Sequence, residues 1–105
     1  MADKPLNPQG KSYGLAWCVA HPGKGDELEK LLVMAGQSGR SSELEPFCDE
    51  FRVFRFGDEF RLLEIFDETK GGVTEHQNSK AFNEVGSRTD IVASRGMRFY
   101  EEVKF

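Results

Sequence analysis

Large and small side chains alternate along residues 12–21 with the period of two that is typical of a β-strand. One face carries the large side chains Tyr13, Leu15, Trp17 and Val19, and the other carries the small ones Gly14, Ala16, Cys18 and Ala20. The small face allows a helix or a ligand to approach closely, whereas the bulky face has to be covered by something large. Pro22 and Gly23 then end the predicted strand.

The apolar residues change to helical spacing after this turn. The i, i+3, i+4, i+7 pattern of an amphipathic helix is formed by Leu28, Leu31, Leu32 and Ala35. Asp26 falls in the first turn, where the helix dipole favours negative charge. Gly36 and Gly39 are suitable C-terminal stops. We therefore predict a helix that starts near residue 26, followed by a loop over residues 38–46.

Residues 47–56 and 59–66 predict a hairpin of two antiparallel strands around the tight Gly57-Asp58 connection. In the second strand one face carries Leu63 and Ile65, and the other carries Phe60, Leu62 and Phe66. Neither face of this strand is polar enough to be fully solvated. Glu64 is the exception, because it places a carboxylate on the same face as the two phenylalanines.

Residues 70–94 show a helical pattern that glycines interrupt. The predicted inward positions are Val73 and His76 in a first piece and Phe82, Val85, Thr89 and Val92 in a second. Gly71, Gly72 and Gly86 weaken the pattern, since each glycine costs about 1 kcal/mol inside a helix. Residues 97–105 alternate again, which predicts a closing strand.

The order β-α-β-β-α-β predicts an α+β fold of ferredoxin-like topology, with a four-stranded antiparallel sheet and both helices on one face. At 105 residues the chain has the size of one domain. We expect this domain to cover residues 12–105 and to follow a polar, disordered N-terminal tail of residues 1–11.

Two helices cover only one face of such a sheet, so the second face needs a partner. The large apolar side chains on that face are Tyr13, Leu15, Trp17, Leu63 and Ile65. A patch of this kind usually marks an interaction site. A two-fold interface lets the same patch cover itself, so we predict a homodimer that packs sheet against sheet.

Composition narrows the partners further. The formal net charge of −4, with no cluster of Lys or Arg, argues against a nucleic acid partner. No stretch approaches the roughly 20 apolar residues that span a bilayer, and the polar N-terminal residues do not resemble a signal peptide. We expect a cytoplasmic protein with no membrane contact. Cys18 and Cys48 lie in or beside predicted strands and suit small buried side chains better than a disulfide or a metal site.

His76 and Glu64 are the candidate catalytic residues. An imidazole exchanges protons near neutral pH, so His76 is either a general base or a helix histidine that hydrogen-bonds to the sheet and fixes the packing. Glu64 is either a base whose pKa burial raises or a carboxylate paired with an arginine on a neighbouring strand. In proteins generally, the packing role is commoner for a histidine such as His76, and the paired role is commoner for a carboxylate such as Glu64. Three aromatic residues, Phe60, Phe66 and Phe82, are candidates to line a pocket for a flat ligand. The alternative is that they simply fill the core.

Other site chemistries have weak support in the sequence. His21 precedes Pro22 at a strand end, so we expect it to lie exposed in a loop. Two histidines without a cysteine or carboxylate cluster at ligand spacing do not indicate a metal site. Gly23-Lys24-Gly25 lacks the spacing of a phosphate-binding loop. We therefore predict neither a metal nor a cofactor.

Three segments of the chain form a recognisable set. They are His21-Pro22-Gly23-Lys24 between a strand and a Leu-rich helix, Glu45-Pro46-Phe47-Cys48 at the start of the second strand, and Leu63-Glu64-Ile65-Phe66-Asp67-Glu68 followed by His76-Gln77-Asn78-Ser79-Lys80-Ala81-Phe82. Together they resemble the antibiotic biosynthesis monooxygenase family of dimeric α/β barrels. The resemblance extends from Gly14 to Phe105 and agrees with the fold derived above. It implies a homodimer whose pocket lies between the sheet and the helices.

What this resemblance implies for activity is mixed, because similar proteins include cofactor-free monooxygenases of phenols or quinols, haem-degrading enzymes and enzymes that process signal molecules. At the positions where haem-degrading relatives carry Asn, Trp and His, this chain has Ala16, Phe66 and Gly86. We therefore do not expect haem, and we include Ala16 among the pocket residues. The leading hypothesis is a cofactor-independent, monooxygenase-like protein that binds and oxidises a small aromatic or quinol-type molecule. The alternatives are a non-catalytic dimeric ligand-binding or structural module and an isomerase or lyase on the same scaffold.

Overall fold

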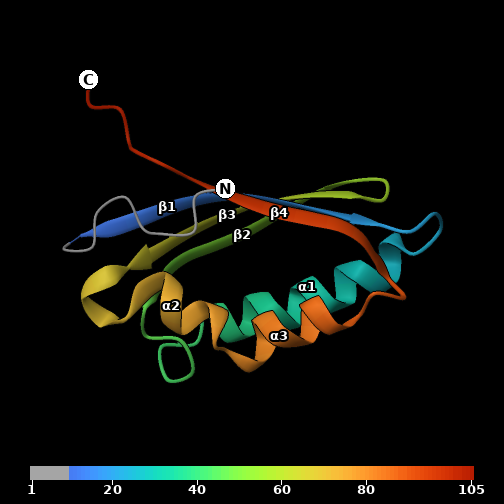
Figure 1. Ribbon diagram of the computed structural model, residues 1–105, viewed down its shortest axis with the longest axis horizontal. Helices are drawn as coiled ribbons and strands as arrows, with labels where there is room; N and C mark the ends of the chain where they lie inside the picture. The colour runs from blue at the N-terminus through green and yellow to red at the C-terminus, as the bar shows by residue number, and fades with distance from the viewer. Residues whose placement is uncertain (1–9) are drawn as a thin grey trace.

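The computed structural model describes residues 10–105 and shows a four-stranded antiparallel sheet with every helix on one face (Figure 1). The elements in chain order are β1 (Lys11–Ala20), α1 (Gly25–Gly39), β2 (Cys48–Phe56), β3 (Glu59–Asp67), the 3₁₀ turn η1 (Glu68–Lys70), α2 (Gly72–Gln77), α3 (Lys80–Ser87) and β4 (Val92–Tyr100). The strand order across the sheet is β2-β3-β1-β4. This arrangement confirms the predicted ferredoxin-like α+β fold, with the second helical region divided into two helices.

The two faces of β1 differ as the alternation predicts. Ala16, Cys18 and Ala20 are buried on the face that the helices cover. Gly14 is also on this face, and a Cβ there would lie 3.2 Å from the sulfur of Met97 in the neighbouring strand. The small residues of β1 thus bring the helical layer and its side chains close to the centre of the sheet.

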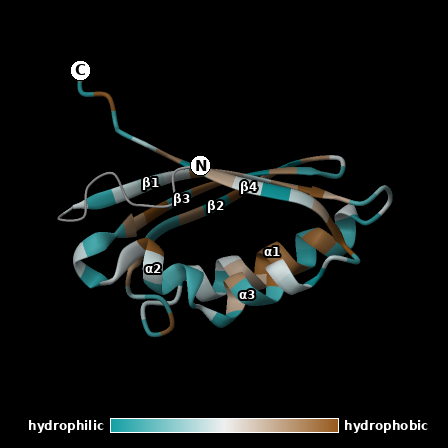
Figure 2. Cartoon of the chain, viewed as in Figure 1, coloured by the Kyte–Doolittle hydropathy of each residue, from teal (hydrophilic) through white to brown (hydrophobic). Residues whose placement is uncertain are grey.

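The core lies between the sheet and α1, and Figure 2 shows hydrophobic residues of that helix in brown. The predicted apolar stripe of α1 is buried, and its members are Leu28, Leu31, Leu32 and Ala35. A second, smaller cluster under α2 consists of Phe47, Phe66, Val73 and Phe99. Full burial of each such side chain stabilises the fold by about 1.5–3 kcal/mol.

The opposite face of the sheet carries large apolar side chains that the helices do not cover. Leu15 is 49% exposed and Trp17 is 39% exposed, while Tyr13, Leu63 and Ile65 are half-buried. The same face continues toward the β2–β3 hairpin, where Phe54 and Phe56 are exposed. Within residues 10–105, no helix is long and apolar enough to cross a membrane.

The C-terminal third of the chain departs from the sequence prediction. The helical pattern was expected to run to residue 94, but α3 ends at Ser87 because the backbone turns there, with the amides of Ile91 and Val92 donating to the Arg88 carbonyl. Thr89 and Val92 are therefore not helical. The closing strand starts at Val92 rather than at residue 97.

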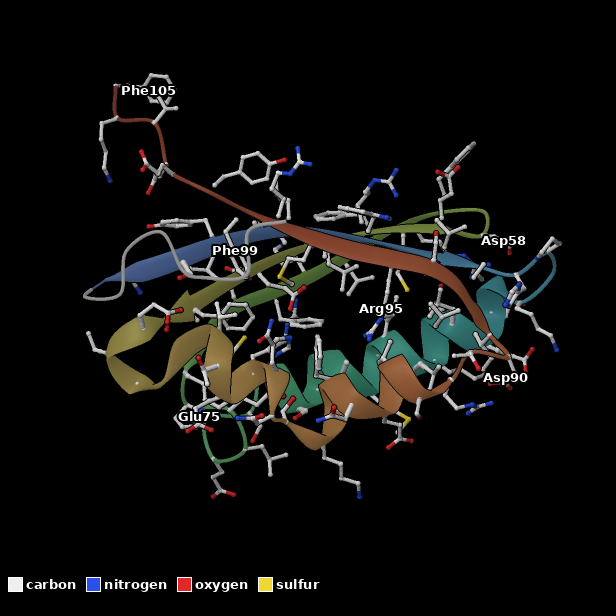
Figure 3. All side chains as sticks on the ribbon, viewed as in Figure 1. Asp58, Glu75, Asp90, Arg95, Phe99 and Phe105 are labelled. Carbon is white, nitrogen blue, oxygen red and sulfur yellow. The ribbon has the colours of Figure 1, made fainter. Side chains whose placement is uncertain are left out.

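The closing strand also ends earlier than predicted, at Tyr100 instead of residue 105. Tyr100 pairs with Tyr13, close to the start of β1. The last five residues extend away from the sheet to Phe105 (Figure 3). At the other end, Lys11 belongs to β1 and forms an ion pair with Asp49, so only residues 1–9 of the predicted tail lie outside the described residues.

Candidate functional site

A cavity of about 330 Å³ lies between the sheet and the helices. Its walls include Ala16 and Cys18 of β1, Leu32 of α1, Glu64 of β3, and Met97 of β4. The remaining walls contain Trp17, Phe51 and Leu62 together with the helical residues Ala35, His76, Gln77, Phe82 and Val85 and the β4 residues Arg95, Gly96 and Phe99. This volume is within the range of small-molecule sites, and most of the lining side chains are apolar.

Four of the six candidate site residues lie on this cavity: Ala16, Glu64, His76 and Phe82. The other two, Phe60 and Phe66, are fully buried and do not line it. Phe60 belongs to the core cluster under α1. Phe66 lies behind the imidazole of His76, with 4.6 Å between the ring centroids.

The short helix α2 places His76 in the cavity wall. It begins at Gly72, which has a φ of 48°, and the backbone amide of Val73 donates to a carboxylate oxygen of Glu68. Val73 and His76 are three residues apart, so they share the inward face of the helix and are both buried. The predicted inward position of His76 is confirmed.

The imidazole of His76 lies between two buried carboxylates. Its Nδ1 is 3.4 Å from Oε1 of Glu45 and forms a hydrogen bond with it. Its Nε2 is 3.2 Å from Oε1 of Glu64, but this contact lies outside hydrogen-bond geometry, so Glu64 Oε1 has no hydrogen-bond partner among residues 10–105. An acceptor that lacks a donor thus faces an apolar cavity, an arrangement that costs free energy unless a ligand or water supplies the donor.

These contacts determine the charge of His76. Burial alone would lower its pKa, but the interactions with Glu45 and Glu64 outweigh burial and raise the pKa to about 9. Burial likewise acts to raise the pKa of Glu45, but hydrogen bonds from His76 and Ser38 outweigh it and lower the pKa. At neutral pH the site therefore holds an imidazolium beside an ionised Glu45, and His76 has no free lone pair with which to act as a general base.

The partner of Glu64 is not the one that the sequence favoured. Its cross-strand neighbours are Gly14 on β1 and Phe51 on β2, neither of which is an arginine. Because β3 is a central strand under the helices, the side chain of Glu64 contacts α2 instead, where His76 is the available cation. The expected arginine pairing is wrong.

Sequence reasoning missed two residues of the site, Glu45 and Arg95. Glu45 is buried in the loop before β2 and lies 31 positions from His76, so no local periodicity indicates it. The only signal was its place at the start of the Glu45-Pro46-Phe47-Cys48 segment. Arg95 fell between the predicted helical region, which ended at residue 94, and the predicted strand, which began at residue 97, whereas the structure places it in β4 at the cavity.

The expected loop position of His21 is confirmed, since it is exposed and its Nε2 is 3.0 Å from the carbonyl oxygen of Thr89. Within the part of the chain that the structure describes, no three His, Cys, Asp or Glu side chains are grouped so as to hold a metal ion. Glu45 and Glu64 lie on opposite nitrogens of one imidazole, which leaves no shared coordination point. Cys18 and Cys48 are both free thiols, and burial raises the pKa of Cys48 to about 12.

Solved structures share this fold along almost the whole chain. The protein PA3566 from Pseudomonas aeruginosa has a TM-score of 0.79 at 16% identity, covering 93% of this chain and 99% of that one. A putative antibiotic biosynthesis monooxygenase from Caulobacter crescentus has a TM-score of 0.77 at 19% identity, covering 94% and 95%. One from Nitrosomonas europaea, described in the same words, has a TM-score of 0.74 at 16% identity, covering 93% and 96%.

These similarities confirm the resemblance at the level of the fold: the chain has the architecture of structures described as putative antibiotic biosynthesis monooxygenases. No family model matches the sequence, and no curated protein matches it. Activity therefore has to be argued from the side chains of this site, since one fold supports many functions.

Proposed function

We propose that this protein is a cofactor-independent monooxygenase that binds a small phenol or quinol in the cavity and oxidises it with dioxygen. The observation that carries the proposal is the buried Glu64 carboxylate, whose Oε1 lacks a hydrogen-bond donor and faces the cavity beside the imidazolium of His76. A phenolic hydroxyl group supplies the donor that Glu64 lacks.

In this proposal Glu64 is the base and His76 stabilises charge. Glu64 accepts the phenolic proton, and the resulting phenolate is electron-rich enough to reduce dioxygen. His76 keeps its proton, because its pKa is about 9, and its positive charge stabilises the phenolate and the reduced oxygen species that follows. Glu45 holds the imidazolium in place through Nδ1.

The overall reaction balances with dioxygen as the only oxidant. A phenol with an unsubstituted ring carbon and one dioxygen give a quinone and one water. One oxygen atom enters the ring as a carbonyl, the other leaves as water, and the phenol supplies all the electrons. Apart from the proton acceptor, the protein has to provide a dry pocket, which the apolar lining contributed by Leu62, Phe82 and Val85 supports.

We also propose that the working form is a homodimer. The support is the uncovered apolar face of the sheet, where Leu15 and Trp17 are exposed beside the half-buried Tyr13, Leu63 and Ile65. A second copy placed sheet against sheet covers this patch with the same patch. Most of the cavity lining lies on the helical side of the sheet, and of the five patch residues only Trp17 also lines the cavity.

The test is oxygen consumption by the purified protein with a panel of electron-rich phenols and quinols. We expect a rate above that of buffer, and Glu64→Gln should lower it by roughly 10²- to 10⁴-fold, the usual effect of losing a general base. Glu75→Gln is the matched control, because Glu75 is next to His76 in the sequence but exposed. A wild-type rate equal to that of buffer, with ligands that still saturate the protein, would indicate a binding module and overturn the proposal.

A further inference from the structure

Arg95 is a cation at the cavity without a counter-ion. Its side chain points from β4 toward the helices, as Figure 3 shows, and its guanidinium carbon is 5.2 Å from the ring centroid of Phe82. Among residues 10–105 it takes part in none of the ion pairs, which elsewhere join Arg55 to Asp26 and Glu29 and Arg88 to Asp90. A ligand in the cavity therefore meets a free positive charge at this wall.

The fold makes room for this guanidinium. Gly86 is inside α3 without a positive φ, so its backbone conformation does not require glycine. A Cβ at Gly86 would lie 2.6 Å from a terminal nitrogen of Arg95. The helix thus accepts a glycine, which costs about 1 kcal/mol relative to alanine, at the point where the arginine packs against it.

The cavity therefore offers a ligand two polar contacts, a hydrogen-bond acceptor at one place and a cation at another. Glu64 offers an acceptor that lacks a donor, beside His76. Arg95 offers a cation that lacks an anion, with its guanidinium carbon 5.2 Å from the centroid of the Phe82 ring, and that ring lies 5.1 Å from the ring of His76. Between these two places the walls are apolar or aromatic, since Ala16, Phe82 and Met97 line them.

We propose that the ligand is a hydroxylated aromatic carboxylic acid. Its hydroxyl group donates to Glu64, its ring packs against Phe82, and its carboxylate binds Arg95. This assignment rests on the proposed function in using the same cavity, and it adds the anionic group that a simple phenol lacks. An arginine matches a carboxylate through paired N–H donors, which gives both affinity and orientation.

The experiment compares acids with their neutral amides by isothermal titration calorimetry, using para-hydroxybenzoate and para-coumarate as probes. We expect the wild type to bind at least one acid roughly 10- to 100-fold more tightly than its primary amide, which corresponds to the strength of hydrogen bonds to a charged group. Arg95→Gln should remove this preference, because it weakens binding of the acid and leaves binding of the amide unchanged. Arg98→Gln is the matched control, because Arg98 is exposed on the same strand but pairs with Leu15 on the open face.

A second variant separates position from charge. Gly86→Ala keeps Arg95 but displaces its guanidinium, so it should weaken acid binding while leaving the folded state at least as stable in urea denaturation. Equal affinity of the wild type for acid and amide, no binding of either, or equal losses in Arg95→Gln and Arg98→Gln would overturn the inference. Because the experiment measures binding, its failure can be told apart from the failure of the proposed function. Oxidation of neutral phenols by a protein that does not bind acids preferentially would contradict this inference alone. Acid-selective binding without turnover would contradict only the monooxygenase proposal.

Discussion

At the scale of the residue, the site depends on one buried imidazolium between two buried carboxylates. His76 is 6% exposed, Glu45 2% and Glu64 3%, so none of these charges is solvated by bulk water. Buried charges are tolerated when they are paired, and removing one member leaves its partner uncompensated. The proton on His76 is therefore part of the folded structure as well as of the proposed chemistry.

The first prediction concerns pH. Because His76 binds its proton more tightly in the folded protein, with a pKa of about 9 against 6.5 for an unperturbed histidine, its contribution to stability is complete below about pH 6.5 and is lost as the pH rises through 9. The free energy of unfolding should fall by a few kcal/mol over this range, at about 1.4 kcal/mol per pKa unit. Urea denaturation at a series of pH values measures it.

The control for this prediction is His76→Gln, which should be less stable at pH 6 and should lack the decline that His76 causes. Glu45→Gln should lower the pKa of His76 and move the decline to lower pH, which an NMR titration of the imidazole detects directly. A wild-type stability curve parallel to that of His76→Gln between pH 6.5 and 9 would contradict the charge assignment.

At the scale of the element, the C-terminal half of α1 contains two glycines that face the same aromatic ring differently. A Cβ at Gly36 would lie 3.5 Å from the nearest carbon of Phe51, an ordinary contact. A Cβ at Gly39 would lie 3.1 Å from Phe51 and 3.4 Å from that residue's own Cβ. The first position has room for a methyl group, and the second has not.

The second prediction follows from this difference. Gly36→Ala should raise the free energy of unfolding by up to about 1 kcal/mol, because alanine is the better helix former. Gly39→Ala should give no gain, since the methyl group has to push Phe51 aside. Chemical denaturation of the two variants beside the wild type tests this pair, and a larger gain from Gly39→Ala than from Gly36→Ala would contradict the packing described.

Elements with a clear apolar period were predicted well, and the failures have a local cause. The stripe of α1 and the two faces of β1 and β3 each follow a single period, and the structure confirms them. Thr89 and Val92 happened to continue the α3 spacing across a turn. Arg95 was left between two predicted elements, since the edge strand β4 is exposed along residues 93–95 and shows no alternation there.

The site was predictable only as far as its residues lie on regular elements. His76 and Glu64 could be placed on inward faces from spacing alone. Their contact could not, because it depends on how α2 sits over β3. Glu45 belongs to a loop, and only the fold of residues between α1 and β2 brings it under the imidazole. The same tertiary contacts raise the pKa of His76 to about 9, so the sequence alone left open the alternative that His76 is a general base.

At the scale of the whole molecule, the sheet has one face that the chain covers and one that it does not. The uncovered face carries Leu15, Trp17, Phe54 and Tyr100, all exposed. Trp17 lies flat against β4, where a Cβ at Gly96 would be within 2.7 Å of three atoms of its ring. This face is therefore preorganised and apolar, which favours binding of a second flat apolar surface.

The third prediction concerns assembly. The wild type should sediment as a dimer at micromolar concentration, and Leu15→Glu should shift it to a monomer, because a charge at the centre of the interface cannot be solvated there. Trp17→Glu should have the same effect. Val33→Glu is the matched control, since Val33 is 51% exposed on α1, away from the sheet.

Circular dichroism of each variant separates a dissociated dimer from an unfolded chain. If Leu15→Glu is folded and still dimeric, the interface lies elsewhere. An interface on the helical side would then be disrupted by Val33→Glu instead. A wild-type monomer at every concentration tested would mean that Leu15 and Trp17 stay in water, and the sheet-to-sheet dimer would be wrong. Leu15 does not line the cavity, whereas Trp17 does, so a folded Leu15→Glu monomer should still bind ligands there, which makes assembly and ligand binding separately measurable.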